Sequence, residues 1–185
     1  MNINNKTNYK DFDEYLQIFK CVIEQGYPIL IDHTIEIYLD KYNNYDPPCT
    51  EPMVSIAMKK VTDLPFDLII VKPDYMDKLG NSLFNSFTKE ELFALLSHEM
   101  GHLAAYYNNQ DCEGVAEEII ADKCAYDLGL GVPMIEAIKK MKEDYNYSPN
   151  SHFNSLPGLN KYSTGEMDKR IVELEKLTTI TDATM

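Results

Sequence analysis

The sequence predicts an α+β fold with a small mixed or antiparallel sheet. A helical pattern occupies residues 10–25, segments rich in β-branched and aromatic residues lie between residues 29 and 72, and helical patterns return from residue 88 onward. Chains that group their strands in one stretch and most of their helices in another fold as α+β domains. With 185 residues, the chain is long enough for one domain with a sizeable core.

The first helix is predicted at residues 10–25, and a glycine follows it as a stop signal. Its apolar residues recur at helical spacing; they are Phe12, Leu16, Phe19 and Ile23. Three strands are predicted next: a partly alternating one at 29–39, a weaker one at 53–61 and a buried one at 66–72. The Asn, Asp and Pro residues of 42–52 predict a loop between the first two strands.

The next helix is predicted to begin at Thr88. The run Thr88-Lys89-Glu90-Glu91 has the pattern of a capping box, in which the threonine and the second glutamate each bond to the other's backbone N–H. The apolar residues that follow keep helical periodicity; they are Leu92, Leu95, Leu96, Met100 and Leu103.

Three further helices are predicted. The first covers about 112–128, with Gly129 and Gly131 as its stops. The second runs from Pro133 to about residue 145, and an amphipathic helix at 166–177 closes the chain after a long loop.

The composition restricts the kind of protein. A formal net charge of −13 repels phosphate backbones and anionic lipids, so we expect no general binding to nucleic acid or to membrane surfaces. No segment approaches the roughly 18 apolar residues of a membrane span, and the polar N-terminus does not have the pattern of a secretory signal. We therefore expect a cytoplasmic protein.

The four cysteines form no CxxC, which favours reduced thiols; two disulfides in a secreted protein are the alternative.

Residues 98–102 read His-Glu-Met-Gly-His, an HExxH motif inside a predicted helix. His98 and His102 share one helical face, so both imidazoles can bind one zinc ion at about 2.0–2.1 Å. Glu99 is expected to accept a proton from a zinc-bound water. Gly101 indicates that another backbone packs closely here, since a mid-helix glycine costs about 1 kcal/mol relative to alanine. Chance is the alternative, because composition alone produces the motif in roughly one such sequence in a hundred.

A catalytic zinc site needs a third protein ligand and a fourth position for water. Glu118 and Asp122 stand at i and i+4 of the next predicted helix, and Glu118 is the preferred third ligand. Asp122 is expected to accept the second N–H of His98, with His102 as the less favoured partner. Glu117 is the alternative ligand. Its side chain would point about 100° away from that of Glu118 around the helix axis, and we expect it to have no supporting role for the metal ligands. The alternative for the whole segment is that its acidic residues only form a solvent-exposed face of the helix and bind no metal.

The other two histidines are weaker candidates for function. His33 lies in a predicted strand, where we expect a hydrogen-bonded or exposed imidazole. His152 lies in the long loop and is a candidate for stabilising the oxyanion of a tetrahedral intermediate. Tyr145, Tyr147 and Tyr162 are the alternatives for that role.

Two segments together resemble a family of zinc metallopeptidases. LFALLSHEMGH and EEIIADKCAYDLG are similar to the gluzincins of the HtpX-like and CAAX-prenyl-protease-like groups, in which an HExGH helix precedes an ExxAD helix. FDLIIVKPDYMDKLGN and YSTGEMDKRIVELEKL add weaker similarity, so the resemblance covers about residues 64–177. Because no membrane span is predicted, the chain is most similar to the small soluble members called minigluzincins.

The resemblance implies a zincin-like core, in which a small sheet packs on an active-site helix and a glutamate helix, with further helices at both ends of the chain. It implies one zinc ion bound by His98, His102 and Glu118, and peptide-bond hydrolysis with Glu99 as general base. Arg170 matches an arginine of the family and is expected either near the site or in a surface ion pair. Ser-Thr-Gly replaces the family's Thr-His-Pro element, so no role of that histidine is carried over.

We expect one metallopeptidase domain over residues 1–185, with an N-terminal helix and strands to residue 63, a catalytic core at 64–145, and a loop and C-terminal helix at 146–185. Its partner would be a peptide or protein substrate.

Three alternatives to this function remain. The first is a regulatory protease of the ImmA/IrrE type that cuts a repressor, in which Asn usually replaces Asp122. The others are a latent zinc protein whose cleft residues 146–185 block, and a metal-free helical interaction module.

Overall fold

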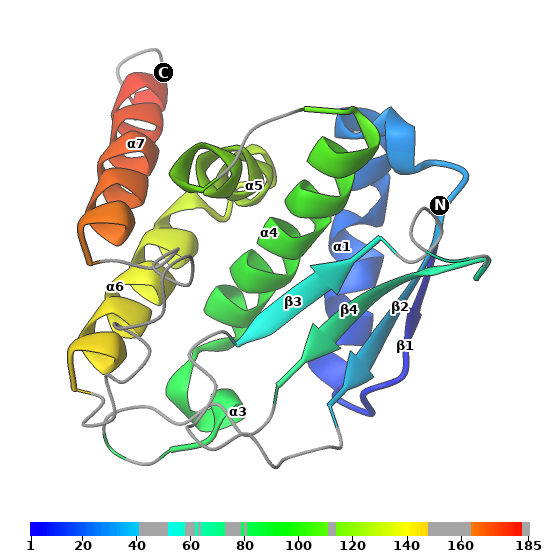
Figure 1. The fold of residues 1–185 in the computed structure, drawn as a ribbon, viewed down its shortest axis with the longest axis horizontal. Coiled ribbons are helices and arrows are strands. Elements are labelled where there is room, and N and C mark those ends of the chain that lie inside the picture. Colours follow the sequence, from blue (N-terminus) through cyan, green and yellow to red (C-terminus); the bar gives the residue numbers. More distant parts are fainter. Residues whose placement is uncertain are drawn as a thin grey trace.

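The computed structural model describes residues 1–40, 52–57, 62, 64–72, 79, 81–110, 114–147 and 164–182. Within these residues the chain forms six α-helices, a short 3₁₀ helix and a four-stranded sheet, which confirms the predicted α+β class. The elements are β1 (Asn2–Asn5), α1 (Lys10–Gly26), η1 (Pro28–Leu30), β2 (Thr34–Leu39), β3 (Met53–Ile56), β4 (Asp67–Val71), α3 (Leu83–Ser86), α4 (Lys89–Tyr107), α5 (Val115–Asp127), α6 (Gly131–Tyr147) and α7 (Thr164–Asp182). Figure 1 shows the sheet on one side, α5, α6 and α7 on the other, and α4 between them.

The sheet is mixed, with the strand order β1-β2-β4-β3. β1, β2 and β4 run parallel, with Ile37 opposite Ile69. β3 runs antiparallel to β4, with Ser55 opposite Ile69. β3 is therefore an edge strand, and it is the strand that lies nearest to α4 (Figure 1).

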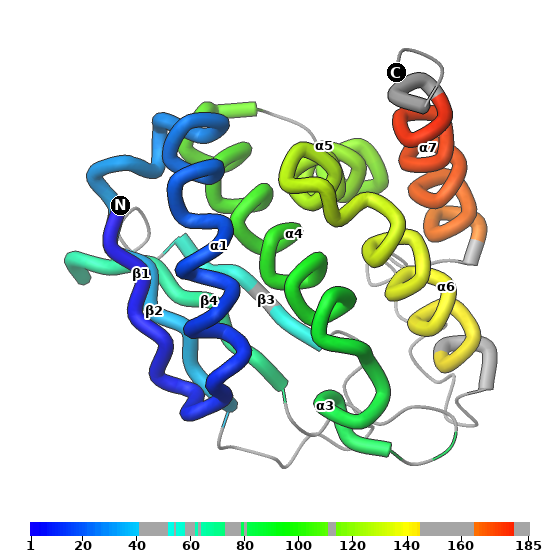
Figure 2. The backbone as a smooth tube through the Cα atoms, turned by 180° about the vertical axis from the view of Figure 1, so that it is seen from behind, coloured from blue at the N-terminus to red at the C-terminus, as the bar shows by residue number. Residues whose placement is uncertain are grey.

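One face of the sheet packs against α1 and α4, which lie side by side in Figures 1 and 2. Alternate residues of β2 and β4 are fully buried on this face; they are Ile35, Ile37, Ile69 and Val71. Phe12, Tyr15 and Ile23 of α1 are fully buried in the same hydrophobic cluster. Burying each such side chain contributes about 1.5–3 kcal/mol to the free energy of folding, so this layer holds α4 firmly in place.

The contact between α4 and α5 depends on a glycine. A Cβ atom at Gly101 would lie 2.6 Å from the carbonyl oxygen of Ala121 and 2.7 Å from its Cα. These separations are shorter than any side chain allows, so the two helices approach as closely as they do because position 101 has no side chain. The close backbone approach predicted from Gly101 is confirmed.

Several predicted boundaries need correction. In the strand predicted at 29–39, η1 replaces the first part, because Pro28 fixes a φ suited to the first turn of a helix. Gly131 begins α6 and does not end α5; Gly129, with a φ of 78°, ends α5 as predicted. β1 and α3 were not predicted, since β1 is mostly asparagine and α3 is a single turn.

The closing helix α7 is longer than the predicted 166–177. Most of the predicted loops at 42–52 and 146–165 lies outside the described residues. Among the residues that are described, no helix is long and apolar enough to cross a bilayer.

Candidate metal centre

The histidines of the HExxH motif lie on α4, whose start is fixed by the predicted capping box. The backbone N–H of Thr88 donates to Oε2 of Glu91 at 2.7 Å, and the N–H of Glu91 donates to Oγ1 of Thr88 at 3.2 Å. Nζ of Lys140 on α6 also donates to Glu91 at 2.6 Å. These bonds fix the N-terminal turn of α4 relative to α6.

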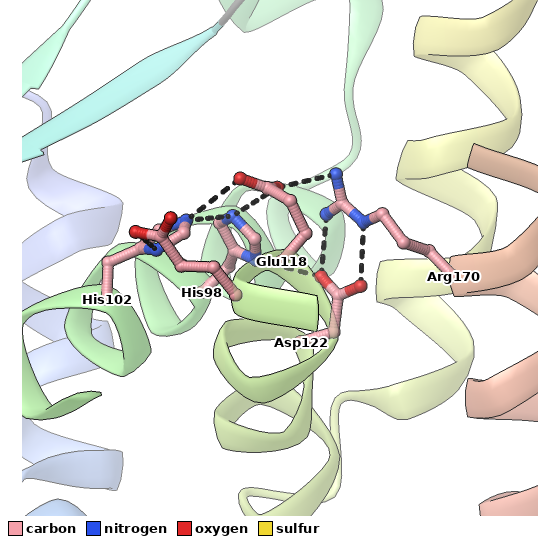
Figure 3. A network of polar contacts seen from close by, with 6 residues as sticks. His98, His102, Glu118, Asp122 and Arg170 are labelled. Atoms are coloured by element: carbon pink, nitrogen blue, oxygen red, sulfur yellow. Dashed lines mark hydrogen bonds and ion pairs between the residues drawn. The ribbon is translucent and has the colours of Figure 1, made fainter. Parts of the chain in front are cut away.

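The structure brings together the three predicted metal ligands (Figure 3). The Nε2 atoms of His98 and His102 lie 2.9 Å apart, and their rings are perpendicular. On α5, Oε2 of Glu118 lies 3.4 Å from Nε2 of His98, and Oε1 lies 3.4 Å from Nε2 of His102. One ligand atom from each of the three residues lies within 4.8 Å of the other two.

This spacing fits one metal ion. Ligand atoms placed tetrahedrally at 2.0–2.1 Å from a zinc ion are separated by about 3.3 Å. Each histidine nitrogen has one oxygen of Glu118 at about this separation, Oε2 at 3.4 Å from His98 and Oε1 at 3.4 Å from His102. The two imidazole nitrogens would need to move apart by about 0.4 Å, which a small rotation of either ring supplies. The cluster can therefore bind a metal ion.

Asp122 orients His98, as predicted. Its Oδ1 lies 2.8 Å from Nδ1 of His98, and the aspartate is 1% exposed. A proton at Nδ1 of the neutral imidazole would be held by this aspartate, and the lone pair at Nε2 would then face His102 and Glu118. A carboxylate on the far nitrogen of a metal-binding histidine fixes its tautomer and increases its basicity.

Glu117 corrects an expectation, because it does contact the site. Its Oε1 lies 3.4 Å from Nδ1 of His102, and its side chain is 38% exposed. Glu117 and Glu118 point in different directions on α5, but His102 presents one nitrogen toward each of them. Sequence reasoning missed this role because it considered only partners within α5; the adjacent acidic pair was the available signal.

Arg170 of α7 lies at the site and not in a surface ion pair. The arginine is 3% exposed. Its Nε and Nη2 donate to Oδ2 and Oδ1 of Asp122 at 2.8 and 2.7 Å. Its Nη1 lies 2.8 Å from Oε2 of Glu118 (Figure 3). The closing helix is thus tied directly to two acidic residues of α5.

The electrostatic environment favours a cation. Burial lowers the pKa of His98, but hydrogen bonds to Asp122 and Glu118 outweigh it and raise the pKa to about 10. Burial raises the pKa of Glu118, but the two histidines and the charge of Arg170 hold it far below its usual value. Burial likewise raises the pKa of Asp122, and the charge of Arg170 together with His98 lowers it overall. Both carboxylates are ionised at neutral pH, and a bound metal would replace a proton on His98.

Glu99 lines a pocket beside the ligands. It is 7% exposed and shares a pocket of about 40 Å³ with His98, Glu118 and Arg170. The remaining lining is apolar and consists of Pro52, Met53, Leu95, Met134, Met141 and Met167. One water molecule requires about 10–15 Å³ of such space, so a water and a small group fit beside Glu99.

His33 is a hydrogen-bonded structural histidine, as expected. Its Nδ1 lies 2.9 Å from Oδ2 of Asp67, and the hydroxyl of Tyr107 donates to Oδ1 of the same aspartate at 2.7 Å. The side chains of the oxyanion candidates lie outside the described part of the chain; they are His152, Tyr145, Tyr147 and Tyr162. Cys21 is an exposed free thiol and Cys124 a buried one, while Cys49 and Cys112 lie outside the described residues.

Comparisons of the chain with protein-family models, with curated proteins and with solved structures gave no match. The resemblance to gluzincins therefore stays a prediction.

Proposed function

We propose that the protein is a zinc-dependent endopeptidase of the gluzincin type, similar to the soluble relatives of the HtpX-like and CAAX-prenyl-protease-like groups. The observation that carries the proposal is the meeting of His98, His102 and Glu118 beside a pocket that also contains Glu99. Two histidines, one carboxylate and an open fourth position are the ligand pattern of catalytic zinc sites. A purely structural site has no use for a carboxylate in the position of Glu99.

The side chains of the site have complementary roles in this reaction. A zinc ion held by the three ligands supplies a Lewis acid that polarises a carbonyl and acidifies water. Glu99 accepts the proton of the attacking water and delivers it to the leaving amine. Asp122 holds His98 in the tautomer that binds metal, and Glu117, 3.4 Å from Nδ1 of His102 and partly exposed, gives that imidazole weaker support.

The arrangement of elements supports a zincin-like core. α4 takes the place of the active-site helix and α5 that of the glutamate helix. Met53 of the edge strand β3 lines the same pocket as Glu99. An extended peptide that paired with β3 at this end of the sheet would pass beside the pocket. The ion pair between Asp122 and Arg170 favours this family over the ImmA/IrrE type, where Asn is usual.

The proposed location is the cytoplasm, and the proposed partner is a peptide or protein substrate. The free thiols of Cys21 and Cys124 agree with a reducing compartment.

The test is cleavage of casein and of a peptide library by the zinc-loaded protein, compared with Glu99→Gln. The amide is nearly isosteric with the carboxylate but cannot accept the proton, so we expect kcat/KM to fall about 10²–10⁴-fold while zinc content stays the same. Glu90→Gln, an exposed change in the first turn of the same helix, is the matched control and should keep full activity. Equal activity of wild type and Glu99→Gln would refute the role of Glu99.

A further inference from the structure

Arg170 joins the closing helix α7 to both acidic residues that serve the candidate metal centre. Three nitrogens of its guanidinium contact carboxylate oxygens of Asp122 and Glu118 at 2.7–2.8 Å. The side chains of the arginine, the aspartate and the glutamate are 3%, 1% and 10% exposed. Charge-assisted bonds of this kind are short and directional, and removing one partner leaves an uncompensated buried charge.

The two oxygens of Glu118 have different surroundings. Oε2 lies 2.8 Å from Nη1 of Arg170 and 3.4 Å from Nε2 of His98, whereas Oε1 faces Nε2 of His102 at 3.4 Å. An oxygen that accepts a charge-assisted hydrogen bond has less electron density to share with a metal ion. Oε1 is therefore the better ligand atom of the carboxylate.

We propose that Arg170 is a positioning residue that restricts Glu118 to ligation through the single oxygen Oε1. If both oxygens bound, the two histidines and Glu118 would supply four donor atoms, and a water molecule would make the site five-coordinate. With Oε2 held by the arginine, they supply three, and one coordination position stays open for water and substrate. The inference rests on the proposed metal site but not on peptidase activity.

The planar guanidinium suits this task better than an ammonium group. Arginine presents five N–H donors in a fixed fork, whereas lysine is a point charge on a flexible stem. The same guanidinium also holds both oxygens of Asp122, which in turn orients His98. One side chain thereby orients two of the three ligands.

The experiment replaces zinc with Co²⁺, whose visible absorption is several-fold stronger in four-coordinate than in five- or six-coordinate sites. We expect wild type to show the intense bands of a four-coordinate ion. Arg170→Met keeps the apolar stem and removes the fork, so its bands should weaken and its Co²⁺ affinity should fall about 10–100-fold. Lys169→Met, an exposed neighbour on α7, is the matched control and should match wild type in both measurements.

Wild-type intensity and affinity in folded Arg170→Met would overturn the proposal. If that variant does not fold, as far-UV circular dichroism would show, Arg170→Lys replaces it; weaker bands support the proposal and unchanged bands reject it. Wild type that binds no Co²⁺ would instead contradict the metal site itself, and the proposed function with it.

Discussion

Each imidazole of the candidate metal centre has a carboxylate of α5 on its far nitrogen, but the two pairs differ in environment. Asp122 is 1% exposed and lies 2.8 Å from Nδ1 of His98. Glu117 is 38% exposed and lies 3.4 Å from Nδ1 of His102. Water screens the second pair far more than the first, so the two carboxylates should contribute unequally to metal binding.

This difference predicts unequal effects of two matched substitutions. Asp122→Asn removes the charge that pairs with both His98 and Arg170, and we expect zinc affinity to fall about 10–100-fold. Glu117→Gln removes a partly exposed pair worth about 0–1 kcal/mol, so its loss should be about fivefold at most. Competition with a chromophoric chelator measures both affinities. Equal losses would show that burial does not separate the two roles.

The residues of the site were predictable to the extent that they follow helical spacing. His98 and His102 share a face of one helix, and Glu118 and Asp122 share a face of the next, so the sequence predicts both pairs. The positions of Glu117 and Arg170 depend on how α4, α5 and α7 pack against one another. No spacing within a single helix contains that information.

At the scale of elements, the separation of α4 and α5 controls the distance between the histidines and Glu118. The predicted contact at Gly101 is real, and the capping box at Thr88 forms as its pattern predicts. The β-strand elements were harder to predict. The asparagine-rich β1 is a strand because β2 offers it a partner, with Ile3 opposite Ile35, and not because of its own propensity.

Substitution of Gly101 tests this separation. Gly101→Ala improves helix propensity by about 1 kcal/mol, but its Cβ would meet the backbone of Ala121 at 2.6 Å. The helices must move apart, so we expect a lower Tm and at least about tenfold weaker zinc binding. Differential scanning calorimetry and chelator competition provide the two values.

Gly26→Ala is the control for this experiment, because a Cβ at Gly26 would meet nothing within 4 Å. This variant should keep the zinc affinity of wild type. If Gly101→Ala also kept its Tm and affinity, the close contact would not control the site.

At the scale of the whole molecule, the candidate metal centre lies where distant parts of the chain meet. α4 and α5 provide the ligands, and α7 provides the arginine that holds them (Figures 1 and 3). One hydrophobic cluster includes buried residues from Phe12 of α1 to Leu174 of α7. The α+β class was predictable from the order of the elements, but whether the sheet is mixed or antiparallel, its strand order and the docking of α7 required the tertiary structure.

The metal content of the purified protein tests the central claim most directly. After incubation with zinc and exhaustive dialysis, elemental analysis of wild type should give one zinc ion per chain, as a single cluster of three ligands requires. His98→Ala and Glu118→Ala, measured in parallel after a check of folding, should retain close to none. Wild type without bound zinc, or variants that hold as much zinc as wild type, would contradict the account.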